Sequence, residues 1–333
     1  HEPEYRVYAF EWERILSDIC GLPKGTDLYN ENLQRLKDAE AYRHIYGSEI
    51  WGNLTKWRLP DDNFAPAMLE SGLGTLLVDI SASALFERGV NFRCGDWRAK
   101  DEADAKRERA IYDLYKNNNM ATVLMECAVS CAVDADVFLE LWKPEGEDVV
   151  VIPRSATEVF PVYRYKGAGY AKNPMSACHV VYQTEPKPYY KRTYSLINGN
   201  CWAWGERWRL TDSGAKMEAQ EPFYETGLDF IPVYHVKNKG SLNRYFGLSD
   251  YDNAVDLLVE LNKALSDQED ARRLNAFPVK WVQGWGVDLN QLYVAPDAVW
   301  EIPEGGSVGM LTVGAEFFRA MQENIDKLEQ LIY

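Results

Sequence analysis

The chain has 333 residues and a formal net charge of −15, with 51 acidic residues against 36 basic ones. Hydrophobic residues make up 46% and aromatic residues 13%, so the chain can bury a large core and is neither disordered nor fibrous. The acidic excess argues against a protein whose main task is gripping nucleic acid, because neutralising phosphates needs clustered lysine and arginine.

Length and cysteine content give further expectations about the number of domains and the cellular compartment. At roughly 150 residues per domain, the length predicts about two units. The six cysteines are scattered through a chain too long to need disulfides, so we expect reduced thiols in a reducing compartment. The longest apolar candidate, Ala121 to Val133, contains Glu126 and is too short to span a membrane. We expect neither a membrane segment nor a signal peptide.

The first 135 residues predict mainly helices. Apolar residues recur at spacings of three and four in residues 6–50, which indicates a helical arm. The predicted elements that follow are a proline-containing loop at 51–66, a buried helix at 67–86, a short strand at 90–94, a charged helix at 101–116 closed by three asparagines, and a buried helix at 120–133.

From Asp136 onward the pattern becomes β-rich. Short runs of β-branched and aromatic residues are separated by Gly, Pro and Asn, which predicts an antiparallel sheet region. The predicted strands are 137–142, 149–152, 159–165, 177–183, 189–197, 201–210 and 231–236. Asn198-Gly199-Asn200 is the clearest hairpin signal, since an Asn-Gly step adopts the positive φ values of a tight turn.

A long amphipathic helix is predicted from Ser249, as its N-cap, to about residue 275. One side is rich in leucine. The opposite side carries Asp252, Asp256, Glu260, Asp267 and Asp270, with Lys263 the one basic residue in that stripe. A solvated face is the ordinary explanation of such a stripe. Like charges at i, i+4 nevertheless forgo helix-stabilising pairs, which suggests that the stripe faces something that must not bind.

The remaining residues predict a compact insert followed by a helix. Residues 277–312 contain two short strands with Gly turns, and residues 315–333 form a helix with apolar residues along one side. No internal repeat is visible, which counts against a solenoid or a propeller.

Catalytic and metal-binding motifs are weak throughout. Cys127 and Cys131 have helical i, i+4 spacing, but they lack the further ligands that a zinc site requires. Gly247-Leu248-Ser249 begins like a nucleophile elbow, but Tyr251 replaces the final glycine. We therefore expect no metal, no cofactor and no catalytic residue.

Three tryptophans give the best argument for an enzyme. Trp202, Trp204 and Trp208 have even spacing on one predicted strand, so they share a face that could stack against sugar rings. A carbohydrate-active hydrolase would also need two carboxylates beside a cleft. Cross-strand aromatic packing in a sheet is the favoured alternative.

Several blocks of the sequence resemble the portal proteins, or head-to-tail connectors, of tailed bacteriophages. The clearest are the runs 231–236 (IPVYHV) and 246–250 (FGLSD), then 261–267 (LNKALSD) on the long helix, then Phe277-Pro278. The segment 78–92, the helix that ends in Asn117 to Asn119 and the strand 136–142 follow the same family order. Together these blocks look like the long-tailed-phage branch and cover nearly the whole chain.

The resemblance implies an α+β subunit with a wing, a two-helix stem and a small clip insert, assembling into a ring. By analogy, residues 1–247 form the wing, 248–275 the first stem helix, 276–313 the clip and 314–333 the start of the second stem helix. The tunnel loop and crown of the family are not seen in the sequence after Tyr333.

The implied function is structural and not enzymatic. A ring of probably twelve subunits at one capsid vertex would pass double-stranded DNA during packaging by terminase and later ejection into the tail. The implied partners are further copies of the chain, terminase, major capsid and scaffolding proteins and a head-tail adaptor. The implied location is the virion, and the host cytoplasm during assembly.

Two sets of residues are assigned within that hypothesis. Asp252, Asp256, Glu260 and Asp267 would face the channel, where their charge would keep passing phosphates from sticking. A competing geometry puts these acids on the outer rim. Trp281, Trp285, Tyr293 and Trp300 would make the clip contacts to terminase and adaptor. A carbohydrate-active hydrolase and a ring-forming tail adaptor remain the alternative functions.

Overall fold

A computed structural model of the chain describes residues 11–47, 67–86, 89–95, 101–144, 146–164, 174–183, 188–211, 213–240, 243–276, 279–283, 304–311 and 314–332. The chain divides into two compact units. The first comprises residues 1–53 and 72–255, and the second comprises residues 54–71 and 256–333. Helices and strands occur together, which confirms the mixed helix-and-sheet class that the sequence predicts.

The helices of the first unit begin at recognisable caps. The Thr26 side chain accepts a hydrogen bond from the Tyr29 amide at the start of α2, and Asp101 does the same for Asp104 at the start of α5. The helical elements are a π-helical turn η1 (Ile15–Ile19), α2 (Asp27–Tyr46), α4 (Leu73–Phe86), α5 (Glu102–Asn117) and α6 (Met120–Asp134).

The strands of this unit form two antiparallel sheets. One has the order β2-β1-β9, and the other has the order β3-β4-β5-β6-β7 with β8 also paired to β6. Their bounds are β1 (Asp136–Trp142), β2 (Val150–Ser155), β3 (Val159–Tyr163), β4 (Met175–Gln183), β5 (Tyr189–Ile197), β6 (Asn200–Thr211), β7 (Gly214–Gln220), β8 (Tyr224–Glu225) and β9 (Val233–Lys237).

The hairpin between β5 and β6 confirms the predicted Asn-Gly turn. Ile197 pairs with Asn200 across the turn, and Asn198 and Gly199 have φ values of 51° and 89°. Two successive positive φ values are the geometry that matches the twist of a two-residue hairpin. The turn fixes the register in which Tyr194 faces Ala203.

Two apolar clusters hold the layers together. The larger contains Phe138 of β1 with Val180 of β4 and Tyr194 of β5, so it joins the two sheets. The second contains Leu16 of η1 and Leu36 of α2 with residues of β3 and β4, so these helical elements cover the other face of the larger sheet. Successive side chains of β4 point to opposite faces of the sheet, so this strand contributes residues to both clusters.

A buried carboxylate links the two sheets as well. Glu140 of β1 has no exposed surface, and its oxygens accept hydrogen bonds from Arg154 of β2 at 2.8 Å and from Arg192 of β5 at 3.2 Å. The hydroxyl of Tyr194 donates to the same carboxylate at 2.6 Å. Burial first, and then the negative charge of Glu140, raise the pKa of Tyr194 well above its usual value.

Two of the predicted elements differ from the structure. The predicted strand at 90–94 does not form, because the amides of Phe92 and Cys94 donate to Tyr112 and Glu108 of α5 instead of to a neighbouring strand. The predicted helix at 67–86 begins only at Leu73, and residues 67–71 have no helical structure. Apolar composition alone did not distinguish these conformations.

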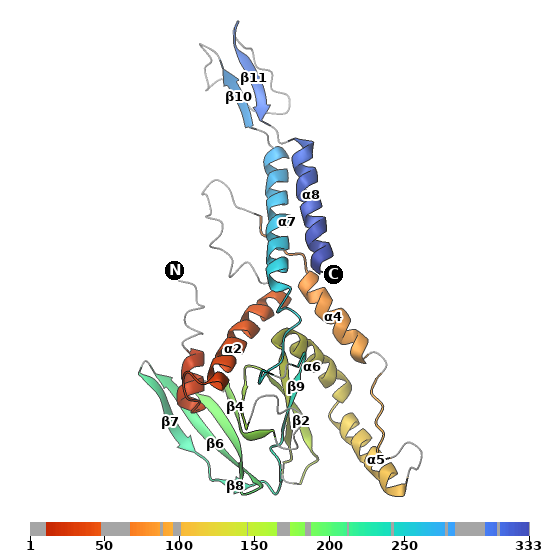
Figure 1. The fold of residues 1–333 in the computed structure, drawn as a ribbon, viewed down its shortest axis with the longest axis vertical. Coiled ribbons are helices and arrows are strands. Elements are labelled where there is room, and N and C mark those ends of the chain that lie inside the picture. The colour runs from red at the N-terminus through yellow and green to blue at the C-terminus, as the bar shows by residue number, and fades with distance from the viewer. Residues whose placement is uncertain are drawn as a thin grey trace. The chain divides into compact units, whose positions relative to one another are not determined.

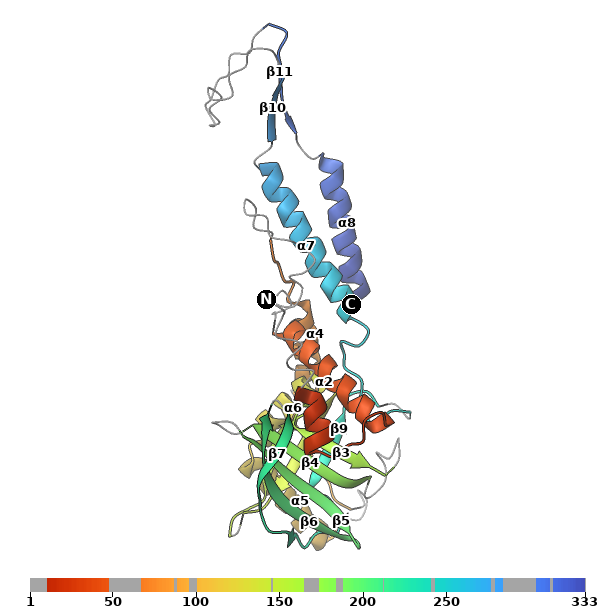
Figure 2. The same ribbon diagram turned by 90° about the vertical axis from the view of Figure 1, so that its left-hand side faces the viewer.

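The second unit contains two helices and a β-hairpin. The elements are α7 (Val255–Ala276), β10 (Val279–Gln283), β11 (Ser307–Leu311) and α8 (Ala315–Ile332). β10 and β11 pair in antiparallel register, and α7 and α8 lie side by side with the hairpin beyond their joined ends (Figures 1 and 2). The described part of the chain contains no helix with the length and apolar character of a membrane span.

Removing the carboxylate that joins the sheets tests this arrangement. We expect Glu140→Ala to lower the free energy of unfolding by about 3–5 kcal/mol, because it leaves two arginines without their buried partner. Chemical denaturation followed by tryptophan fluorescence measures this. Asp113→Ala, at an exposed position in the middle of α5, is the matched control and should change stability by less than about 0.5 kcal/mol. Equal effects of the two substitutions would contradict the role of Glu140.

Candidate functional site

The helical hairpin of the second unit contains most of the predicted site. α7 is 22 residues long, which corresponds to about 33 Å of helix, and α8 has 18 residues. The two run antiparallel, since the side chain of Gln268 donates to Gln322 at 3.0 Å and a groove lies between them near residues 260–267 and 321–328. Along α8 the apolar side chains follow one face, with Ile325 buried and Met321 and Leu328 half-buried.

The predicted acidic stripe occupies several different environments. Asp256 and Glu260 are exposed on α7, and Glu260 pairs with Lys263 at 2.6 Å. Asp267 is half-buried and, with Glu260, lines the groove beside α8. Asp252 lies in the turn before α7, in the first unit, where it accepts a hydrogen bond from the hydroxyl of Tyr42 at 2.8 Å. Whether any of these acids faces a channel stays a prediction.

A buried row of polar side chains on α7 was not singled out from the sequence. Asn262, Ser266 and Asp270 follow one another at i, i+4 and i+8, and each is at most 5% exposed. They accept hydrogen bonds from the amides of Ser71 at 2.9 Å, Leu69 at 2.9 Å and Ala67 at 2.8 Å, in that order. We call the three acceptors the polar ladder and residues 67–71 the strap.

The spacing of the acceptors along the polar ladder is close to the spacing of alternate amides along the strap. Four residues of helix rise about 6.0 Å, and two residues of an extended chain span about 6.6 Å. Every second amide of the strap therefore meets the next acceptor on α7. Ser266 also donates its hydroxyl to the carbonyl of Asn262 at 2.8 Å, which orients its oxygen as the acceptor for the strap. The i, i+4, i+8 spacing of short polar residues is the sequence signal for this ladder.

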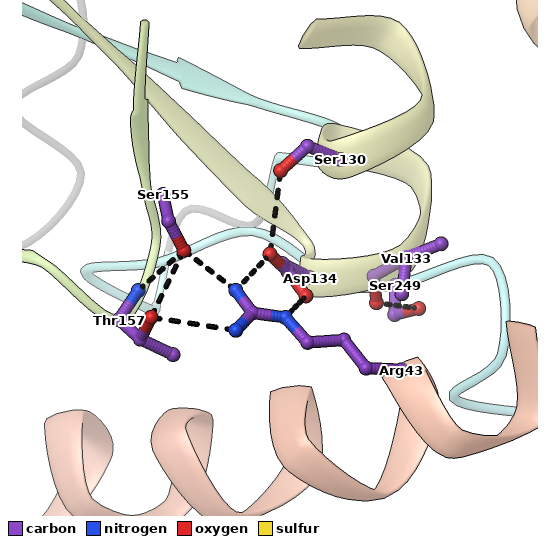
Figure 3. A network of polar contacts seen from close by, with 7 residues as sticks. All are labelled: Arg43, Ser130, Val133, Asp134, Ser155, Thr157 and Ser249. Carbon is purple, nitrogen blue, oxygen red and sulfur yellow. Dashed lines mark hydrogen bonds and ion pairs between the residues drawn. The ribbon is translucent and has the colours of Figure 1, made fainter. Parts of the chain in front are cut away.

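Ser249 does not cap α7, contrary to the prediction. The helix begins at Val255, after a turn at 250–254. The Ser249 hydroxyl donates to the carbonyls of Ala132 at 2.9 Å and Val133 at 2.7 Å. These carbonyls belong to the last turn of α6, where intrahelical partners run out. Ser249 thus supplies a hydrogen-bond donor to the end of α6, and Figure 3 shows its contact with Val133.

The same end of α6 is held by an arginine of α2. Arg43 donates to both oxygens of Asp134 at 2.9 and 2.6 Å and to Ser155 at 2.5 Å (Figure 3). Ser130 donates to Asp134 at 3.3 Å. Burial lowers the pKa of Arg43, but its hydrogen bond with Asp134 and the charge of that group more than compensate and raise it. This network joins α2, α6 and the end of β2.

Of the predicted clip residues, the structure describes one. Trp281 of β10 is 40% exposed and lies against Gly309 of β11, its partner in register. A Cβ atom at Gly309 would come within 2.7 Å of the indole, so the glycine makes room for the ring. Trp285, Tyr293 and Trp300 lie outside the described residues.

The tryptophans of β6 are engaged with a carboxylate. The indoles of Trp204 and Trp208 donate to the two oxygens of Glu206 at 2.9 and 2.8 Å, and Lys191 pairs with the same group at 3.0 Å. Burial raises the pKa of Glu206, but these donors outweigh burial and lower it. A carboxylate with a lowered pKa is a poor general acid, so this stripe gives no support to a hydrolase.

The cysteines of α6 behave as buried thiols. Burial raises the pKa of Cys127 to about 11 and that of Cys131 to about 12, which disfavours the thiolate that a metal requires. Within the described residues, no group of three or more His, Cys, Asp or Glu side chains has the geometry to hold a metal ion.

Comparison with known proteins adds a weak structural likeness. No family model matches the chain, and no curated protein matches it. One of the solved structures with some similarity is described as the virion of a native gene transfer agent particle. The match has a TM-score of 0.40 and 13% sequence identity, and it covers 66% of this chain and 57% of that chain. It therefore spans little more than half of the other chain's length.

The polar ladder predicts a local effect of mutation. We expect Ser266→Ala to speed hydrogen exchange at the Leu69 amide and to lower stability by about 1 kcal/mol, because a partly buried amide loses its acceptor. Exchange measured by mass spectrometry on peptides covering residues 67–71 checks this. Asp256→Ala, at an exposed position of the same helix, should leave exchange in the strap unchanged. Unaltered exchange in Ser266→Ala would show that the ladder does not hold the strap.

Proposed function

We propose that this chain is a portal subunit of a tailed phage or a related particle, one of a ring that conducts double-stranded DNA. The observation that carries the proposal is the α7, β10-β11, α8 hairpin. It has the helix, small β insert and returning helix that the sequence resemblance implies for stem and clip. A hairpin of this kind can line a hollow axis when copies repeat around it.

The charge of the chain is consistent with a conduit. With a net charge of −15, repeated copies repel phosphate, so a duplex would slide past instead of sticking. Asp256 and Glu260 are the acids of the predicted stripe that are exposed on α7. They are therefore the strongest candidates for a surface that faces DNA, although an outer-rim position for them remains the competing geometry.

A mass measurement tests the assembly. We expect the full chain to sediment, or to appear in native mass spectrometry, near twelve times 38.1 kDa. A monomer or dimer at micromolar concentration would count against a portal. A ring-forming tail adaptor would also give a large mass, so DNA packaging in the presence of a terminase is the measurement that distinguishes the two.

Charge reversal tests the channel surface. We expect Asp256→Lys, alone and with Glu260→Lys, to slow packaging several-fold, with partial recovery as salt is raised, because new cations would hold phosphates. The rate of DNA uptake by purified capsids measures this, after the ring mass has been checked. Asp113→Lys on α5 is the matched reversal at an exposed position elsewhere. Normal packaging by intact rings of the double variant would contradict the assignment of these acids to the channel.

A further inference from the structure

The groove between α7 and α8 has a volume of about 310 Å³ and lies wholly within the second unit. Part of its lining is apolar and half-buried, namely Ala264 of α7 with Met321 and Leu328 of α8. The carboxylates of Glu260 and Asp267 also line it, seven residues or about 10.5 Å apart along α7. Such a lining suits long basic side chains, because their aliphatic stems cover apolar surface while their charged ends reach carboxylates.

The apolar face of α8 extends beyond the part that packs on α7. Ile325 is buried, whereas Phe317 and Leu331 are 49% and 59% exposed. The exposed residues belong to a row with alternating spacings of four and three, which is the repeat of helices that pack against a neighbouring helix. The row consists of Phe317, Met321, Asn324, Leu328 and Leu331. Its three middle members line the groove, so the row is open to a helix from outside the hairpin.

The opposite side of α8 carries a row of charges. Helical spacing places Arg319, Glu323 and Lys327 on the side of the helix away from Ile325. All three are exposed, and none of them forms an ion pair in the described part of the chain. We call them the outer row. The two basic residues are eight positions, or about 12 Å, apart.

The charge order along the groove is the inverse of that in the outer row. Glu260, Lys263 and Asp267 alternate negative, positive, negative at nearly the same spacing. The groove and the outer row lie on different sides of one hairpin, so a hairpin cannot fill its own groove with its own outer row. A contact between the groove of one copy and the outer row of another is heterologous, and such contacts form a ring when the rotation closes.

The heights of the charges restrict how two copies fit together. Gln268 and Gln322 are close to the same level in one hairpin, because their side chains are hydrogen-bonded at 3.0 Å. Antiparallel counting then puts Asp267 level with Glu323, so two hairpins at equal height would oppose like charges. A shift of about one helical turn brings Asp267 opposite Arg319 instead. Hairpins that are inclined to a ring axis have such a shift between neighbours.

We propose that this groove binds the outer row of α8 from a second copy of the chain. Arg319 of the second copy pairs with Asp267, and its Lys327 reaches Glu260. The inference rests on the proposed function, since the second copy is the next subunit of the ring. Asp256 does not line the groove, so it remains the exposed acid of the stripe that the contact leaves uncovered.

Another pair of basic residues has a similar spacing. Arg109 and Lys116 lie seven positions apart on α5, in the first unit. Rotation about a ring axis brings the same unit of each copy to the same height, which favours α8 over α5 as the occupant of the groove. Arg109 is exposed and therefore provides the matched control.

Charge reversal across the contact tests the proposal, with sedimentation velocity of the full chain at about 0.1 M salt as the readout. We expect Asp267→Lys and Arg319→Glu each to raise the fraction of free subunits at least about tenfold, because like charges then meet between copies. The variant with both changes restores opposite charges and should return that fraction to within about twofold of the unsubstituted chain. Arg109→Glu should leave assembly unchanged.

The outcomes separate this contact from the proposed function. Rings that persist in both single variants, or a double variant that assembles no better than they do, overturn the contact and leave the proposed function standing. An equal loss of assembly in Arg109→Glu shows a general charge effect and also overturns the contact. An unsubstituted chain that forms no ring overturns both proposals. If Asp267→Lys fails to fold, the same comparison with Glu260→Lys and Lys327→Glu decides, since both positions are exposed.

Discussion

A charged carboxylate buried between two sheets constrains the architecture of the first unit. Glu140 is fully buried, and taking its charge out of water is tolerated because two guanidinium groups and a phenol surround it. Those partners come from β2 and β5, so they are in place only when both sheets have their observed registers. The apolar cluster that contains Phe138 and Tyr194 would tolerate small shifts, whereas this polar centre would not.

In the second unit, too, polar groups need hydrogen-bond partners, and here side chains of α7 supply them to backbone amides of the strap. The strap has no neighbouring strand in the described residues, and its amides would be unsatisfied against an apolar helix face. Asn262, Ser266 and Asp270 supply side-chain acceptors at the spacing of an extended chain. The helix thereby supplies the acceptors that a neighbouring β-strand would supply. Because these contacts are made to backbone amides, they fix the extended conformation of the strap without requiring particular side chains in it.

Much of the fold follows from sequence patterns, and the failures have a common cause. The Asn198-Gly199 turn, most strands, and the helices α5, α6 and α8 are set by local propensity and periodicity, which the sequence displays directly. β7 was missed because its residues lack β-branched side chains, and it forms by pairing with β6. The role of Ser249 and the conformation of the strap depend on contacts with residues about 120 and 200 positions away, which no local pattern reports.

The acidic stripe shows why periodicity alone could not define the site. Helical spacing places Asp256, Glu260, Asp267 and Asp270 close together on one side of α7. The strap occupies the edge at Asp270, and Glu260 and Asp267 line the groove beside α8, so these charges already have intramolecular surroundings. Asp256 is exposed on α7, and Glu260 is exposed at the wall of the groove. A helix packed on both flanks can present only a narrow strip to anything outside it, so in the proposed ring the charge that DNA would meet comes from a few repeated residues and not from the whole stripe.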